Sequence, residues 1–166
     1  MLKPELKLEL KLYDYTNMMN KKVLPVEVYD IRKTVFIDEQ KVPEELEWDE
    51  YDKESCHFIV STILGDEIGS SIIKAIATAR MIPQGADIML GRMAVIKDYR
   101  RNKVGSFLLK ACIDYARNRK VKSVIIHAQE AVLNFYQRLG FIEQGEVFYE
   151  ANIRHRQMNL DLNEND

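Results

Sequence analysis

The segment from Val104 to Tyr115 constrains the fold of this 166-residue chain most strongly. Apolar side chains recur there at intervals of three and four residues, at Val104, Phe107, Leu108, Ala111, Cys112 and Tyr115. This spacing predicts an amphipathic helix with one continuous apolar face, which has to pack against another element. The run GRMAVI, at 91–96, comes before it and has the character of a strand. The two runs together predict a helix that packs on a sheet.

The rest of the chain continues this mixture of elements. Leucines alternate with charged residues from Leu6 to Leu12, the period of a half-buried strand, and a first helix is expected between Pro25 and Phe36. Further strands are expected at 56–63, 72–82, 88–96, 123–129, 141–149 and 153–162, the first three as an antiparallel meander and 123–129 covered on both faces. A short helix should stop at Gly140. The order predicts a mixed α/β domain around a mostly antiparallel sheet, spanning 1–166 with a polar tail at 163–166.

Composition argues against several functional classes. The formal net charge of −2 gives no general reason to expect a nucleic acid or an anionic membrane as partner. Cys56, Cys112 and the three histidines are scattered without a metal-type spacing, so no metal is expected. The N-terminal segment lacks the apolar core of a signal peptide, and no run reaches the length of a membrane span. We therefore expect a soluble, cytoplasmic protein.

The loop before the central helix concentrates positive charge. The segment RRNKVG, at 100–105, carries Arg100, Arg101 and Lys103 around the start of the helix, with one glycine, Gly105. A helix start gathers free backbone N–H groups and about half a positive charge, so a pyrophosphate suits it well. Glycine would let the backbone approach such a ligand closely. The alternative is a basic turn on a solvated surface.

Several motifs in order carry a family resemblance. RRNKVG, after the strand GRMAVI, resembles the R/Q-x-x-G-x-G/A pyrophosphate loop of the GNAT family, the GCN5-related N-acetyltransferases. AQEAVLNFYQRLGF, at 128–141, resembles the second signature of that family. IRKTVFIDEQKVPEELEWDEYD, ATARMIP and NIRHRQM resemble its ElaA/YjcF-like branch, so the resemblance runs from Val28 to Leu160. It implies about seven strands and four helices, with the sheet splayed at a cofactor cleft.

The resemblance also implies the co-substrate and its site. Acetyl-CoA would lie between the strands GRMAVI and SVIIHAQ and pass its acetyl group directly to a primary amine of a small molecule, without a covalent enzyme intermediate or a metal. The residues expected to hold it lie on the first strand, in the loop and on the second signature: Met93, Ala94, Val95, Arg100, Arg101, Asn102, Lys103, Val104, Gly105, Ser106 and Asn134. Asn134 could equally be a helix-surface residue.

Two positions depart from the family pattern. Lys103 stands where the first loop glycine is usual, which restricts the backbone or adds charge to the phosphate site. Gly91 stands where many relatives carry a glutamate that is proposed as general base. That role must then be filled by another residue or by water.

The catalytic residues are candidates from the same resemblance. Tyr136 resembles the acid that protonates the departing thiolate, although it could also be a core aromatic residue. Glu39 and Gln40 resemble acceptor-side residues of the branch, and Glu39 and His155 are the candidate bases, with His155 also open to a structural role. His57 and His127 lie in strand-like runs, which favours structural roles for both.

The segment Lys41–Ser55 is acidic and is predicted to be a long loop with one helical turn. Its carboxylates and Trp48 could attract a cationic amine, or the loop could be solvated and anchored by Trp48. Nearby arginines, at Arg32, Arg80 and Arg92, could be ion-pair partners or site residues.

Other functions stay open at this stage. A protein or peptide acetyltransferase would need an open groove, and a catalytically weak acyl-CoA-binding module would fit the changes at Gly91 and Lys103. Exposed strand edges make a homodimer plausible.

Overall fold

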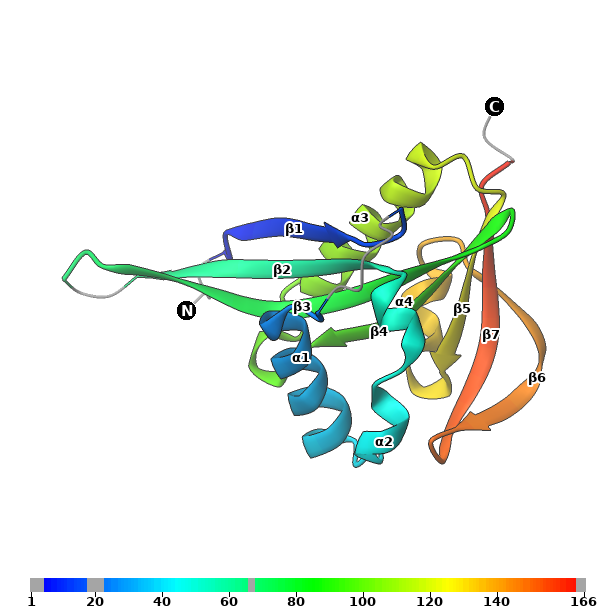
Figure 1. Cartoon of the computed structure of the whole chain (residues 1–166), viewed down its shortest axis with the longest axis horizontal. Coiled ribbons are helices and arrows are strands. Elements are labelled where there is room, and N and C mark those ends of the chain that lie inside the picture. Colours follow the sequence, from blue (N-terminus) through cyan, green and yellow to red (C-terminus); the bar gives the residue numbers. More distant parts are fainter. Residues whose placement is uncertain (1–4, 18–22, 66–67, 164–166) are drawn as a thin grey trace.

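The computed structural model describes residues 5–17, 23–65 and 68–163. One twisted sheet of seven strands, in the order β1-β2-β3-β4-β5-β7-β6, organises the molecule (Figure 1). The strands are β1 (Leu8–Asp14), β2 (Cys56–Gly65), β3 (Ser71–Gln84), β4 (Asp87–Val95), β5 (Ser123–Gln129), β6 (Ile142–Glu150) and β7 (Ile153–Asp161). All neighbours are antiparallel except β4 and β5. This confirms the mixed α/β fold with a mostly antiparallel sheet, while most of the predicted polar tail falls outside the described residues.

The helices follow in chain order. The α-helices are α1 (Val26–Arg32), α2 (Glu44–Glu47), α3 (Val104–Asn118) and α4 (Leu133–Gln137), with a π-helical turn η1 (Lys33–Glu39) after α1 and the 3-10 turns η2 (Glu50–Lys53), η3 (Lys97–Tyr99) and η4 (Glu130–Val132). The predicted single helical turn in the acidic segment is thus two short turns. The predicted stop at Gly140 is wrong by a short turn: α4 ends at Gln137 with Arg138 as its C-cap, and Gly140, with a φ of 96°, lies three residues beyond the helix.

Two hydrophobic clusters place helices on opposite faces of the sheet. The larger one joins α3 and Tyr136 of α4 to strand residues that include Ile88, Leu90, Val124 and Ile126. The smaller one joins α1 and η1 to Ala94 of β4 and to Ile153 of β7. Side chains alternate between the two faces along a strand. The even-numbered residues of β5 therefore face α3, and the odd-numbered ones lie on the side of the sheet that carries α1.

The sequence prediction for α3 is correct in extent and partly wrong in orientation. Phe107 is one of the exposed large hydrophobic side chains, whereas Leu109 and Ile113 are buried with Leu108 and Cys112. The buried stripe is thus rotated away from Phe107. Phe107 instead borders a surface groove with Leu10, Leu12 and other residues of β1, β2 and α3.

The prediction that β5 is covered on both faces is also wrong. Val124, Ile126 and Ala128 are buried, while the intervening residues are partly or fully exposed, including His127. The strand is buried only on the face toward α3. Its other face is open at His127, which matters for the site.

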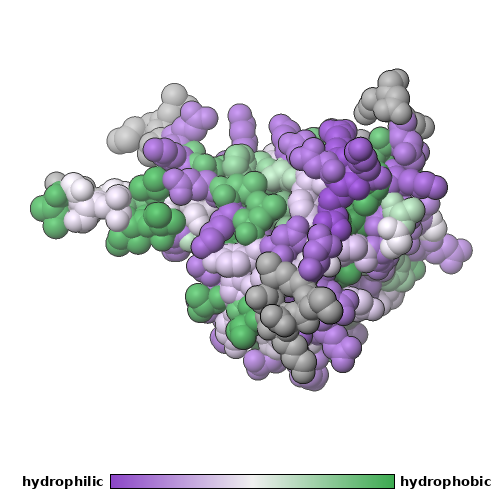
Figure 2. All heavy atoms as spheres, turned by 45° about the horizontal axis from the view of Figure 1, so that its top comes forward, coloured by the Kyte–Doolittle hydropathy of each residue, from purple (hydrophilic) through white to green (hydrophobic). Residues whose placement is uncertain are grey.

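The β2–β3 hairpin projects from the body of the molecule (Figures 1 and 2). In the printed register, β1 pairs with β2 only as far as Thr62, and β4 pairs with β3 only from Ala77 onward. Beyond those points the hairpin is a two-stranded ribbon. Ile72 and Ile73 on it are 67% and 66% exposed.

Candidate functional site

The sheet opens between its two parallel strands. β4 and β5 pair only where Ile88, Met89 and Leu90 face Val124, Ile125 and Ile126. Beyond this point β4 continues to Val95 along β3, and β5 continues to Gln129 along β7. The backbone of the second half of β4 is therefore left without a strand neighbour on the β5 side, within the part of the chain that the structure describes. An extended ligand could pair with it.

A β-bulge shapes the open half of β4. The register slips between Thr78, which faces Ala94, and Arg80, which faces Gly91, so that two residues of β4 oppose one of β3. Arg92 lies in this bulge with a φ of 47°, in the left-handed region. Bulges bend a strand and increase its twist, and they are frequent beside active sites. The bulge begins just after Leu90, the last residue of β4 that pairs with β5.

The loop at the end of β4 forms an anion-binding shape. Arg101 and Lys103 have φ values of 62° and 61°, and Lys103 is the residue that precedes the first turn of α3. A left-handed residue followed by helical residues directs successive N–H groups into one concavity that suits an anion. The helix start adds its own partner-free N–H groups. Lys103 thus adopts the conformation that glycine would favour, at the position where the family pattern expects glycine.

Gly105 has a packing role in the described structure. A Cβ atom built there would lie 3.3 Å from Cζ of Phe135 and 3.9 Å from Cγ2 of Val95. The glycine therefore lets α3 approach the ring of Phe135 on α4 closely. We expected Gly105 to let a ligand approach the backbone. The structure shows that the absence of a side chain at Gly105 also makes room for Phe135.

Arg100 is held by protein groups and points toward the first helix. Its Nε donates to the carbonyl of Val95 at 2.9 Å, and its two terminal nitrogens each donate to Glu39 at 2.7 Å. The hydrogen bonds from Arg100 lower the pKa of the Glu39 carboxyl. This contact joins the end of η1 to the loop, and leaves Arg101 and Lys103 as the more exposed cations beside the helix start.

Tyr136 reaches the open half of β4 from the face that carries α3. The residue is 9% exposed, and its hydroxyl lies 3.6 Å from Sδ of Met93. Its ring packs edge-on against Phe135 and Phe141. Burial raises the pKa of Tyr136 well above its ordinary value, so the hydroxyl keeps its proton at neutral pH. Asn134, on the same short helix, is exposed.

The opposite face of the opening carries a polar group of side chains. Nδ1 of His127 lies 2.8 Å from Oε1 of Glu150, and Nε2 of His155 lies 4.0 Å from the other oxygen of Glu150. Phe148 packs edge-on against His127 and is stacked on His155. Sequence reasoning named His155 but missed Glu150, and it favoured a structural role for His127, which is in fact exposed. Nothing in the local pattern of either residue marks this pair.

Gln40 and Gln129 connect this polar group to the first helix. Nε2 of Gln129 donates to Oε1 of Gln40 at 2.9 Å, so the end of β5 meets the segment that follows η1. Ala151, in the β6–β7 turn, and Ile153 pack against the cluster of Val35 and its neighbours. The β6–β7 hairpin and the first helix thereby border the same side of the opening.

Three carboxylates of the acidic segment form ion pairs with arginines. Arg32, fully buried, donates to Glu47 at 2.7 Å and to Asp52 at 2.6 Å, and its guanidinium lies over Trp48. Removing one partner of a buried ion pair typically costs about 3–5 kcal/mol. Burial would raise the pKa of Asp52, but its hydrogen bond from Arg32 lowers it overall.

Two further arginines join this network from the sheet. Arg80 contacts Asp49 at 2.6 Å, and Arg92 contacts Glu47 and Asp49, each at 3.3 Å. The three arginines are thus ion-pair partners, one of the two roles left open by the sequence. The carboxylates of Glu47, Asp49 and Asp52 are therefore not free to bind a cationic amine, whereas Glu44, Glu45, Glu50 and Glu54 of the same segment are exposed. His57, with Nε2 at 2.7 Å from the Asp52 carbonyl, has the structural role expected of it.

Comparison with known proteins identifies the family. Residues 26–162 match the family described as the Acetyltransferase (GNAT) domain. The chain belongs to the GNAT acetyltransferases. It is 30% identical over 136 residues to the N-acetyltransferase YjcF of Bacillus subtilis, with 81% of this chain and 91% of YjcF covered. It is 31% identical over 133 residues to protein ElaA of Escherichia coli, with 75% of this chain and 79% of ElaA covered.

Solved GNAT structures agree with this assignment. The crystal structure of Escherichia coli ElaA superposes with a TM-score of 0.71 at 25% identity, covering 91% of this chain and 98% of that one. A GNAT family acetyltransferase of Elizabethkingia anophelis, solved with acetyl-CoA bound, has a TM-score of 0.60 at 15% identity and covers 96% of this chain and 100% of its own. The predicted resemblance to the ElaA/YjcF-like branch is confirmed.

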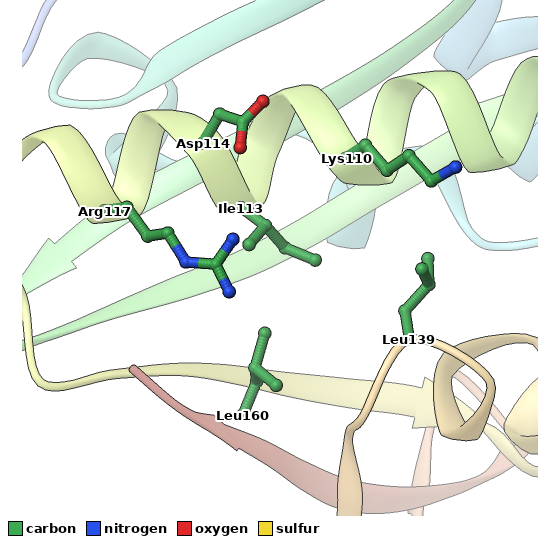
Figure 3. A pocket seen from close by; sticks show the side chains of 6 residues that line it. All are labelled: Lys110, Ile113, Asp114, Arg117, Leu139 and Leu160. Carbon is green, nitrogen blue, oxygen red and sulfur yellow. The ribbon is translucent and has the colours of Figure 1, made fainter. Parts of the chain in front are cut away.

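Other features of the GNAT domain lie away from the opening. A pocket of about 170 Å³ lies between the second half of α3 and Leu139 and Leu160 (Figure 3). It is smaller than the roughly 300–1,000 Å³ usual for ligand sites. Among the described residues, no cluster of His, Cys, Asp or Glu could hold a metal ion. In the same part of the chain, no helix is long and apolar enough to cross a bilayer.

Proposed function

We propose that this GNAT protein is an N-acetyltransferase that uses acetyl-CoA and acetylates a primary amine of a small molecule. The parting of β4 and β5 after Leu90 and Ile126, with the concave loop at its end, carries the proposal. The pantetheine arm would pair with the free backbone at Met93, Ala94 and Val95. Holding the thioester in front of an incoming amine can contribute several kcal/mol to catalysis.

The residues of the loop fit a pyrophosphate. The backbone at 101–106 would bind the phosphate oxygens, and Arg101 and Lys103 would add charge-assisted contacts. Arg100 would act by fixing the loop, since its donors are already engaged by Glu39 and Val95. The relative from Elizabethkingia anophelis, with acetyl-CoA bound in the same fold, supports this choice of co-substrate.

Tyr136 is the proposed acid. Its hydroxyl lies beside Met93, on the open half of β4, and burial keeps it protonated. When the C–S bond of the tetrahedral intermediate breaks, this proton would pass to the departing CoA thiolate. General acid catalysis of this kind is worth about 10²–10⁴-fold. A protein that binds acyl-CoA without turnover is the alternative, favoured by the absence of a side chain at Gly91.

Calorimetric titration with acetyl-CoA tests the co-substrate. The parent protein should bind, and the charge reversal Arg101→Glu should weaken binding by at least tenfold because it places a carboxylate at the phosphate site. Arg101 is preferable to Gly105 as the test position, since any side chain at 105 would press on Phe135. Arg138→Glu, at an exposed position beyond α4, is the matched control and should bind like the parent. A folded parent that does not bind acetyl-CoA would refute the proposal.

A further inference from the structure

The amine acceptor needs a base that the usual strand position does not provide. An alkyl ammonium group with a pKa near ~10 must lose a proton before it can attack a thioester. Gly91 has no side chain, and a Cβ atom built there would meet nothing within 4 Å. Glu39 is engaged by Arg100, which lowers the pKa of its carboxyl and makes it a weaker base.

The pair of His127 and Glu150 borders the opening between β4 and β5. His127 is on the odd-numbered face of β5, just past the last pair with β4, and Tyr136 approaches from the other face. Glu150 pairs with Ile153 across the β6–β7 hairpin, and Ile153 packs against the cluster of α1 and η1. The acid and this pair therefore reach the opening from opposite faces of the sheet.

The contact between the two side chains fixes the chemistry of the imidazole. With Nδ1 protonated and donating to Glu150 at 2.8 Å, the lone pair of His127 is on Nε2. Among the described residues, no group is found bonded to that nitrogen. A carboxylate that holds one ring nitrogen orients the ring and stabilises the imidazolium that forms when the other nitrogen takes a proton. Both side chains are accessible, with 33% and 47% of their areas exposed.

We infer that His127 is the general base of the acetyl transfer and that Glu150 orients it and attracts a cationic alkyl amine as acceptor. The inference rests on the proposed function. The ring of Phe148 packs edge-on against His127 and is stacked on His155, so Phe148 supports the pair from one side. The charged or titratable groups that face the pair are His155, 4.0 Å from Glu150, and Arg92. The hydrogen bond with His127 is the largest cause of the lowered pKa of Glu150, and the charges of His155 and Arg92 act in the same direction.

The proton balance of the reaction follows from these assignments. The acceptor ammonium gives one proton to Nε2 of His127, and the neutral amine attacks the acetyl carbonyl carbon. The new C–N bond forms, the C–S bond breaks, and Tyr136 protonates the thiolate. The second amine proton leaves as the amide forms and restores the Tyr136 hydroxyl through solvent. His127 releases its proton to water, so each turnover yields the amide, CoA thiol and one proton.

The test compares His127→Gln and Glu150→Gln with the parent over pH 5.5–9. Acetyl transfer is followed with acetyl-CoA and a panel of ethanolamine, putrescine and a lysine-containing peptide. His127→Gln should lower kcat by about 10²- to 10³-fold and remove the acidic limb of the profile, while acetyl-CoA affinity stays within threefold. Glu150→Gln should raise KM for the amine as well as lower kcat.

Glu130→Gln is the matched control, because Glu130 also sits in an exposed pair, 2.6 Å from Nε of Arg154. It should leave kcat and KM within twofold of the parent. Activity of His127→Gln within threefold of the parent, or an unchanged acidic limb, would overturn the inference. A parent that binds acetyl-CoA but acetylates none of the amines would overturn it too, with the co-substrate site intact. Failure to bind acetyl-CoA would instead refute the proposed function itself.

Discussion

At the scale of single residues, Lys103 shows how a motif can lose its glycine and keep its shape. A non-glycine residue in the left-handed region costs of order 1 kcal/mol, and Lys103 has a φ of 61° at the start of α3. Its lysine side chain adds a cation beside the proposed phosphate site. The strained backbone position thus carries a side chain whose positive charge could contact a phosphate.

Lys103→Gly should leave the free energy of unfolding within about 0.5 kcal/mol of the parent, because relief of strain offsets the greater entropy of the unfolded chain. The same change at Lys110, an exposed residue inside α3, should destabilise by about 1 kcal/mol. Urea denaturation of the two variants measures the difference. Equal losses at both positions would contradict a left-handed residue at 103.

The arginines mark the limit of sequence reasoning at this scale. Their pairing with Glu47, Asp49 and Asp52 depends on bringing α1, β3 and β4 together around one short segment. The sequence could therefore state the alternatives for these residues but could not decide between them. The pairing of His127 with Glu150, separated by 23 residues, was invisible for the same reason.

At the scale of elements, η1 is joined to the phosphate loop by the pair of Glu39 and Arg100. The hydrogen bonds from Arg100 lower the pKa of Glu39 below its ordinary value of 4.5. A carboxyl whose pKa is lower in the folded state stabilises the fold above its unfolded pKa, and the contribution is lost as the pH falls through the folded value.

Glu39→Gln should therefore cost about 0.5–1 kcal/mol at pH 7, and the cost should decrease as the pH falls through the lowered pKa of Glu39. Urea midpoints measured for both proteins between pH 7 and pH 3 should converge as the pH falls. Asp38→Asn is the control, because Asp38 is adjacent to Glu39 in the sequence and forms an exposed ion pair with Lys33. It should lower the free energy of unfolding at pH 7 by less than Glu39→Gln does. A difference that stays constant over this range would show that the pair does not contribute through its charge.

The sequence predicted where the helices and strands lie, but it was less reliable on which of their side chains are buried. Periodicity found α3 because its apolar stripe is wide, but that width also allowed Phe107 to be counted as buried in place of Leu109 and Ile113. Only the position of α3 on the sheet decides between the two faces. The π-helical turn of η1 had no sequence signal, because its hydrogen bonding depends on the packing of Val35 and Phe36.

At the scale of the whole molecule, the β2–β3 ribbon is set apart from the body. Ile72 is 67% exposed on the ribbon, whereas Ile76, four residues on along β3, is fully buried in the main core. Ile76→Ala should cost about 2–5 kcal/mol in urea denaturation, and Ile72→Ala less than about 1 kcal/mol. A similar loss for Ile72→Ala would indicate that the ribbon is covered in solution, for example by a second copy of the chain.

The overall fold and the family were accessible from the sequence because they depend on order and spacing along the chain. The strand before the loop, the basic helix start and Tyr136 lie in two continuous segments. The proposed acceptor side was not accessible, because the fold alone brings together the elements that would form it. These are η1, the bulge of β4, the end of β5 and the β6–β7 hairpin.

The short pairing of β4 with β5 divides the sheet into two plates, β1–β4 and β5–β7, joined along the strands at Ile88–Leu90 and bridged by α3. Such a connection resists sliding of the two plates along the strands, but it resists their separation at the unpaired end only weakly. A ligand chain bound between β4 and β5 would supply the missing inter-strand hydrogen bonds and stiffen the connection. The parting of strands that would hold the proposed co-substrate thus leaves the protein with a mechanically weak region, which that ligand would strengthen.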